Sequence, residues 1–414
     1  MANTLKVIDM VTKEALRIAH EKATFIGSVD RQYDESFKDN GRGKNGATLR
    51  VREPNQYTRT QGTRVIDVQD QAESTQTITV ATQDHVAMRF NSTELIQSVN
   101  NGAAFDDLSK NYIEPAMASL ISGVESDFLA FCTKAVSNVA GTAGTAITTL
   151  AVPGAARAKL NQNLAPKDKR CIQMDSVTMG SIVNGVSGYF NPSNAIGDQY
   201  KEGLIARTSM ADYYENERVW TMVNGSDVTG STDAAALVTD GGTTIDMHTL
   251  LPVATQVVGQ VFTVAGVYDC HPETKAAYPH LKQFTITAIG ATTTTISPAT
   301  ILSGAKRNVG SSTGAAIATT AFNAQVITFV GAASTSYVQS LMYHPEAFQF
   351  VTADLPLMDG ADKCVRKTQD GISLRVWMDG DIRNDELLMR IDILYGMAAL
   401  RAPWACRMIG SANA

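Results

Sequence analysis

A glycine-rich basic stretch has the first spacing in this sequence that could support chemistry, in this case phosphate binding. The letters GRGKNG occupy residues 41–46, and Lys44 is followed by Asn45 rather than by Ser or Thr. The hydroxyl that holds Mg²⁺ in a phosphate-binding loop is therefore missing, and Lys38 stands where that loop needs its first Gly. We predict a flexible, basic loop tip instead.

Three aspartates in the C-terminal part have spacing that suggests a calcium loop. They are Asp379, Asp381 and Asp385. The fifth and twelfth positions of such a loop supply oxygen ligands, but here they are Arg383 and Arg390. The sequence therefore predicts a solvated turn between two strands.

A short segment with two histidines could be imagined as a metal site. His271 and Glu273 lie close together and His280 follows, but this spacing matches no helical two-histidine pattern. No third ligand is evident. We interpret the segment as a turn between strands.

Nucleophilic catalysis has no support in the sequence. Ser187 lies in GVSG, which lacks the second half of the GxSxG turn. The five cysteines are scattered along the chain and include no CxxC pair, as expected for reduced thiols made in a cytoplasm. They are Cys132, Cys171, Cys270, Cys364 and Cys406. We expect no catalytic residue, no cofactor-binding residue and no metal site.

Two further pairs of residues have both a functional and a structural interpretation. Arg390 and Asp392 fall on the same side of an expected strand. At such positions an ion pair, on the sheet or across a subunit boundary, is more common than a catalytic dyad. Trp377 and Trp404 are isolated from any basic cluster with interleaved aromatic residues. We interpret both tryptophans as anchors in a core or at a subunit interface.

Length and composition limit the class of protein. A chain of 414 residues with 44% hydrophobic residues can bury two or three cores. Its net charge of −6 disfavours sequence-specific nucleic-acid binding, so any contact with nucleic acid should be non-specific. The N-terminal stretch carries charges where a signal peptide needs an apolar core, so we expect no signal peptide. The apolar window at 250–267 is interrupted by Pro252 and Gly259, so we also expect no membrane segment.

The elements that would position these residues follow from hydrophobic periodicity. Residues 3–21 and 105–139 have helical spacing, and Pro115 should either start or kink the second helix. Between them, alternation predicts a long hairpin with a charged tip. From residue 224 to about 324 the chain becomes rich in Thr, Ala, Gly and Val, with strands expected at 261–265, 282–288 and 293–297. This shift of composition predicts an inserted β domain, after which alternating residues predict further strands.

The C-terminal part resembles the coat proteins of tailed phages of the P-twenty-two type, a branch of the HK-ninety-seven shell fold. The phrases that carry the resemblance are MYHPEAFQFVTADLPL, GISLRVWMDGDIRND and MRIDILYGMAALRAPWACRM. VFTVAGVYDCHPETK followed by LKQFTITA is similar to the β-barrel insertion domain of that branch, and YFNPSNA at 189–195 is a weaker match.

The resemblance implies an α+β fold of the HK-ninety-seven type with an inserted all-β barrel. The expected parts are an N-terminal arm at 1–40, an extended hairpin loop and start of the peripheral domain at 41–90, a spine helix and peripheral domain at 91–150, an axial domain at 151–223 and 325–414, and the barrel at 224–324. Their order along the chain is more specific than any single phrase.

The function that the resemblance implies is that of a major capsid protein. Copies would assemble as pentamers and hexamers into an icosahedral procapsid in the host bacterial cytoplasm, and would enclose packaged double-stranded DNA in the virion. The implied partners are other copies of the chain, a scaffolding protein, a portal protein and, in some relatives, decoration proteins. No membrane contact is expected.

Three other interpretations of the function remain open. A bacterial encapsulin shell shares the architecture but holds enzymes. A β-rich phage tail or surface-binding protein would explain the Thr-rich and Gly-rich stretch, though not the long helix. An enzyme without a recognisable motif is the third.

Overall fold

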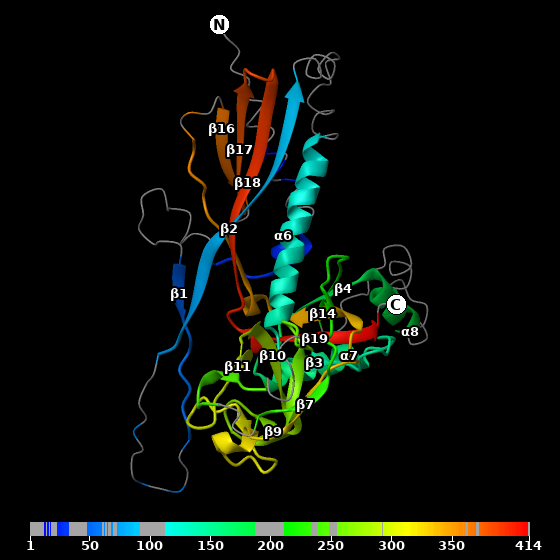
Figure 1. The fold of residues 1–414 in the computed structure, drawn as a ribbon, viewed down its shortest axis with the longest axis vertical. Helices are drawn as coiled ribbons and strands as arrows, with labels where there is room; N and C mark the ends of the chain where they lie inside the picture. Colours follow the sequence, from blue (N-terminus) through cyan, green and yellow to red (C-terminus); the bar gives the residue numbers. More distant parts are fainter. Residues whose placement is uncertain are drawn as a thin grey trace. The chain divides into compact units, whose positions relative to one another are not determined.

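Helices and mostly antiparallel strands alternate along the chain and group into two units. The computed structural model describes residues 12–13, 15, 17, 23–32, 48–59, 62, 64, 68, 73–91, 112–186, 211–233, 238–247, 255–291, 293–358, 360, 363–369 and 372–412. One unit contains residues 1–51, 75–128 and 348–398, and the other contains 52–74, 129–347 and 399–414. The mixture of helix and sheet agrees with the α+β class (Figure 1).

The first unit is organised by a six-stranded sheet. Its strands, in spatial order, are β1 (Thr48–Arg52), β2 (Thr75–Asn91), β18 (Glu386–Ala398), β17 (Ile372–Asp381) and β16 (Lys363–Gln369), and β15 (Gln349–Thr352) also pairs with β18. Alternate residues such as Leu374, Val376 and Ile391 are fully buried, so one face of this sheet forms a core. The short helix α2 (Thr24–Ser28) belongs to the same unit, where Phe25 packs against Phe128 of the long helix.

The long helix α6 runs from Glu114 to Ala135. These bounds fall within the predicted range of 105–139, of which residues 105–111 lie outside the described part. Pro115 is the second residue of α6 and lies in its first turn, where a proline removes no hydrogen bond of that helix.

The second unit contains a mixed six-stranded sheet. The order is β3 (Val139–Ala140), β19 (Ala405–Ala412), β14 (Ser336–Tyr343), β4 (Cys171–Met174) and β5 (Asp212–Glu215), with β6 (Thr221–Val223) also on β14. Helices α7 (Ala151–Gln162) and α8 (Ser176–Val186) supply buried residues to the core of this sheet, among them Leu160 and Ile182.

A second sheet of this unit lies between β6 and β14 in the sequence, so we call it the inserted sheet. Its order is β7 (Thr229–Ser231), β13 (Val326–Phe329), β9 (Val261–Cys270), β10 (Ala277–Ile289), β11 (Thr294–Thr300) and β8 (Gly242–Ile245), with β12 (Val309–Gly310) on β9. The backbone N–H of Asp233 donates to the carbonyl of Asp246 at 3.2 Å, so the segments that follow the two edge strands also meet. Phe262, Phe284 and Phe329 fill the core.

The strands predicted at 261–265, 282–288 and 293–297 are confirmed by β9, β10 and β11. The inserted sheet extends past the predicted limit of 324, because β13 pairs with both β7 and β9. The segment 325–414 also differs from the single axial part predicted for it: residues 348–398 join β2 in the first unit. Alternation identifies a strand but carries no information about the strand with which it pairs.

Within the part of the chain that the structure describes, no helix combines the length and the apolar character needed to span a bilayer.

Candidate functional site: the junction of the inserted sheet

Strand β10 joins the inserted sheet to the ends of two helices. The hydroxyl of Tyr278 donates to the carbonyl oxygen of Gln162, the last residue of α7, at 3.2 Å. The hydroxyl of Thr285 donates to the carbonyl of Lys134, next to the last residue of α6, at 3.1 Å. Because the last carbonyls of a helix have no partner within the helix, β10 satisfies groups that would otherwise need water.

A side-chain amide adds a third connection from the same strand. The backbone N–H of Val139 donates to Oε1 of Gln283 at 2.9 Å, and Nε2 of Gln283 donates to the carbonyl of Val139 at 3.4 Å. Gln283 therefore pairs with the edge strand β3 as a peptide group would. The register of β10 against β9 shifts between Leu281 and Gln283, and such irregularities redirect side chains along a strand.

A buried arginine completes the junction from the C-terminal strand. Arg407 of β19 is fully buried, and its guanidinium donates to the carbonyls of Gly259 (2.6 Å) and Lys134 (3.1 Å) and to the hydroxyl of Thr285 (2.9 Å). Burial lowers the pKa of Arg407 to about 9. Among the described residues no carboxylate pairs with it, so the negative end of α6 and a turn carbonyl compensate the charge.

Gly259 is required at this point for two reasons. Its φ of +98° lies in a region that other residues rarely adopt. A Cβ atom there would also lie 2.8 Å from the ring of Trp220, over which the Lys134 ammonium sits at 5.3 Å from the ring centroid. The close approach of this turn to the end of α6 therefore depends on a missing side chain.

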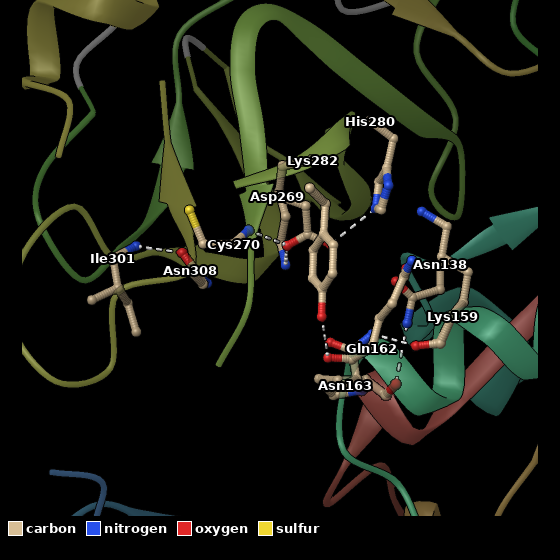
Figure 2. Close-up of polar contacts among 12 residues, drawn as sticks. Asn138, Lys159, Gln162, Asn163, Asp269, Cys270, His280, Lys282, Ile301 and Asn308 are labelled. Atoms are coloured by element: carbon tan, nitrogen blue, oxygen red, sulfur yellow. Dashed lines mark hydrogen bonds and ion pairs between the residues drawn. The ribbon is translucent and has the colours of Figure 1, made fainter. Parts of the chain in front are cut away.

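A second charged cluster lies beside the end of α7 (Figure 2). Asp269 accepts a hydrogen bond from Nζ of Lys282 at 2.8 Å, and Nε2 of His280 is 3.4 Å from its other oxygen. These two groups lower the pKa of Asp269 to about 2, overcoming the effect of burial, which raises it. Burial lowers the pKa of the neighbouring Lys159 of α7, and the charge of Asp269 partly offsets this. The cluster adds electrostatic attraction to the hydrogen bond from Tyr278.

The first unit has its own buried charged network, which confirms the predicted pairing of Arg390 with Asp392. Nε of Arg390 lies 2.5 Å from Oδ1 of Asp392, while Nε and Nη2 of Arg375 donate to Oδ2 at 3.1 and 2.7 Å. Arg375 also donates to the carbonyl of Pro356, and both arginines contact the ring of Trp377. This is an ion pair on the sheet of one chain.

The histidine and aspartate segments form the turns that the sequence predicts. Nδ1 of His271 accepts hydrogen bonds from the backbone N–H groups of Glu273 and Thr274, between β9 and β10. Asp381 accepts from the backbone of Arg383 and from Asn384, between β17 and β18. Within the described residues, no group of His, Cys, Asp and Glu has the arrangement of a metal site.

The remaining predicted residues divide into two groups. Trp404 packs on the core of the mixed sheet and donates from Nε1 to the carbonyl of Asn163 at 3.2 Å, so it is an anchor as predicted. The GRGKNG stretch, Ser187 and YFNPSNA lie outside the described residues. Of the five cysteines, all described, each is a free thiol and four are buried.

The sequence reasoning missed Arg407, Thr285 and Tyr278. One signal was available for Arg407, since a single charged residue inside the apolar stretch ACRMIG indicates a buried cation with specific acceptors. Thr285 and Tyr278 had no such signal, because both are ordinary strand residues.

Part of the chain matches a known protein family. Residues 221–410, somewhat less than half of the chain, match the family model described as P22 coat protein, gene protein 5. The match contains β14 to β18 and every strand of the inserted sheet. It includes all the phrases that carried the resemblance except the weaker one, YFNPSNA, which precedes residue 221. It confirms that resemblance.

Solved structures with low sequence identity were also found, whereas no curated protein matches the chain. A chain from Mycobacterium phage Che8 is 9% identical, with a TM-score of 0.47, covering 93% of this chain and 90% of that one. The capsid of Ralstonia phage GP4 is 7% identical (TM-score 0.44; 89% and 83% covered), as is a virus-like particle from Pyrococcus furiosus (0.39; 97% and 98%). All three TM-scores are below 0.5, so these similarities support no conclusion about this chain.

Proposed function

Because this chain is a major capsid protein of a tailed phage, we propose that its copies form the pentamers and hexamers of an icosahedral procapsid. Assembly takes place in the host bacterial cytoplasm and is guided by a scaffolding protein, and a portal protein occupies part of the shell. The shell expands as double-stranded DNA is packaged. The subunit has an HK-ninety-seven-like fold and no catalytic role, so its function lies in interfaces. The encapsulin and tail-protein readings are not favoured by the family match.

The family match carries this proposal, and the junction made by β10 supports it. A shell subunit that moves as a body during expansion needs its long helix and its sheets held in a fixed arrangement. Tyr278, Gln283 and Thr285 hold the ends of α7, β3 and α6 on one strand. The inserted sheet is thus an internal brace that keeps the subunit in its assembly-competent conformation.

The charge of the chain is compatible with a DNA container. A net charge of −6 limits adhesion of packaged DNA to the inner wall, since like charges repel at short range. Contact with DNA is therefore non-specific, and many modest contacts between subunits sum by avidity in a closed shell.

Electron microscopy of the chain expressed with and without its neighbouring phage genes tests the function. We expect closed, regular shells in the presence of the scaffolding gene and irregular particles without it. Shells that contain an enzyme and never DNA would support an encapsulin compartment, and the absence of any particle under both conditions would contradict the shell function.

The brace is tested by a matched pair of variants on β10. Thr285→Val removes a buried hydroxyl that contacts α6, whereas Thr287→Val makes the same change at an exposed position. We expect Thr285→Val to lower the yield of regular shells and Thr287→Val to leave it unchanged. Deletion of residues 224–324 should abolish regular shells, and normal shells from that deletion would show that the insert is dispensable.

A further inference from the structure

A loop of the inserted sheet between β11 and β12 is held rigidly by its own side chains. Oδ1 of Asn308 accepts a hydrogen bond from the backbone of Ile301 at 3.0 Å (Figure 2). The Nδ2 atom of Asn308 donates to the carbonyl of Ala299 at 2.7 Å. The backbone N–H of Asn308 donates in turn to the carbonyl of Ile301 at 3.1 Å. The two ends of the loop are therefore fixed to each other.

Two charged residues fix the middle of the same loop. Asp240 accepts hydrogen bonds from the hydroxyl of Ser303 and from the backbone of Leu302 (2.8 Å), and these bonds lower the pKa of its carboxyl group. Arg307 donates to the carbonyls of Lys275 and Gly314 at 2.9 and 2.8 Å. A loop held at so many points presents the side chain between them, Lys306, in a defined direction.

Lys306 contacts the base of the connection between β1 and β2. Its Nζ donates to Oγ of Ser74 at 2.6 Å, and Oγ of Ser74 donates to Oε2 of Glu53 at 2.5 Å. The backbone N–H of Glu53 also donates to the carbonyl of Ser74 at 2.9 Å. One hydroxyl thus links a cation on the inserted sheet to a carboxylate on the opposite side of the connection.

This contact differs from an ordinary surface ion pair. Arg52 and Glu73 nearby are 78% and 62% exposed and 3.7 Å apart, so their attraction is largely screened by water. Lys306 is half-buried, and the serine between the two charges uses both its donor and an acceptor position. Residues 52–74 group with the second unit, as a held segment would.

We propose that Lys306 is a positioning residue, which holds the β1–β2 connection on the inserted sheet of its own chain and so sets the direction of that connection before copies of the chain assemble. The inference rests on the proposed function, because it concerns how one subunit engages the next. The inserted sheet then has a task beyond bracing, namely aiming the connection before assembly.

Limited trypsin digestion of the full-length unassembled chain measures the first part of this proposal. Arg59 and Arg64 are exposed residues of the connection and supply cleavage sites. We expect Lys306→Met to speed cleavage there about tenfold, since loss of a charge-assisted hydrogen bond increases local opening by about that factor. Lys306→Arg keeps a donor and a charge and should restore slow cleavage. Lys167→Met, at an exposed lysine of the same unit, is the matched control.

Two readouts separate positioning from general stability. Unfolding of the inserted sheet in urea should be the same in Lys306→Met as in the original chain, while the rate of shell assembly falls and recovers in Lys306→Arg. Unchanged cleavage in Lys306→Met, or equally faster cleavage in Lys167→Met, would show that Lys306 does not hold the connection. Normal assembly despite fast cleavage would overturn the positioning role. If the original chain forms no shell while the cleavage results hold, the proposed function fails and the contact stands.

Discussion

Two fully buried charged residues, one in each unit, are compensated in different ways. Asp392 in the first unit is surrounded by two arginines at hydrogen-bond distance. Arg407 in the second unit has two carbonyls and one hydroxyl as acceptors. The first network matches charge with charge, whereas the second relies on dipoles alone.

The difference reflects what each network holds together. Asp392 and its partners lie on neighbouring strands β17 and β18, so the ion pairs reinforce contacts that the sheet already makes. Arg407 connects β19 with the end of α6 and with the inserted sheet, and its acceptors are backbone groups in all but one case. Arg407 therefore fixes the path of the chain, because a carbonyl can accept only when the backbone is correctly placed.

Removal of the charge from Asp392 should have the largest effect on stability. Asp392→Asn leaves two arginines without their carboxylate, and Arg375 is 4% exposed. Breaking a buried ion pair from one side costs about 4 kcal/mol, so we expect a loss of that size in the free energy of unfolding in urea. Asp379→Asn, at an exposed position of the same hairpin, should change it by less than about 0.5 kcal/mol. A loss below about 1 kcal/mol for Asp392→Asn would contradict charge matching.

Replacement of Arg407 should cost less, because the variant also removes the penalty of burying a cation. Arg407→Met leaves the carbonyls of Gly259 and Lys134 without this donor, and we expect a loss of about 2 kcal/mol. Urea unfolding measures it, with Arg383→Met at an exposed turn position as the control. A loss larger than that of Asp392→Asn would reverse the comparison.

Acid should weaken the cluster at Asp269 in a defined pH range. The pKa of Asp269 is lowered from 3.8 to about 2 in the folded chain, so its ionised form stabilises the fold above about pH 4. That contribution, about 2 kcal/mol, is lost as the pH falls from about 4 to 2. Stability measured against pH should drop more steeply in the original chain than in Asp269→Asn. Parallel curves would show that Asp269 is not coupled to Lys282 and His280.

The smallest effect is expected at the hydroxyl of Thr285. Thr285→Val removes a donor to Lys134 and an acceptor of Arg407, for a loss of about 1 kcal/mol in the free energy of unfolding. Thr287→Val should be close to neutral. Equal losses in both variants would mean that strand propensity, and not the junction, determines the result.

Local patterns predicted the elements of the structure well. The alternation of Ile391, Ile393 and Tyr395 gave a strand, and all three are buried on one face of β18. Arg390 and Asp392 lie two residues apart on such a strand, so their pairing followed from the period of the strand. The restrictions on proline marked Pro115 as either a start or a kink of the long helix, and Pro115 lies in the first turn of α6.

The partners of the elements could not be predicted in the same way. Residues 348–398 were expected in the same domain as β14 and β19. Instead β18 pairs with β2, and Glu386 lies opposite Asn91, almost 300 residues earlier in the chain. β13 likewise belongs to the inserted sheet, although it lies in the segment 325–414 that was expected in the axial domain. A strand exposes the same backbone donors and acceptors to any neighbour, so its sequence does not specify which one it meets.

The sequence alone therefore determined the class of this protein, because the C-terminal phrases and the change of composition at residue 224 are properties of the linear chain. The tertiary structure decided where the inserted sheet is fastened and by which atoms. Arg407, Thr285 and Tyr278 act on backbone carbonyls at the ends of helices, and an unpaired carbonyl has no signature in a sequence until the fold shows where each helix ends.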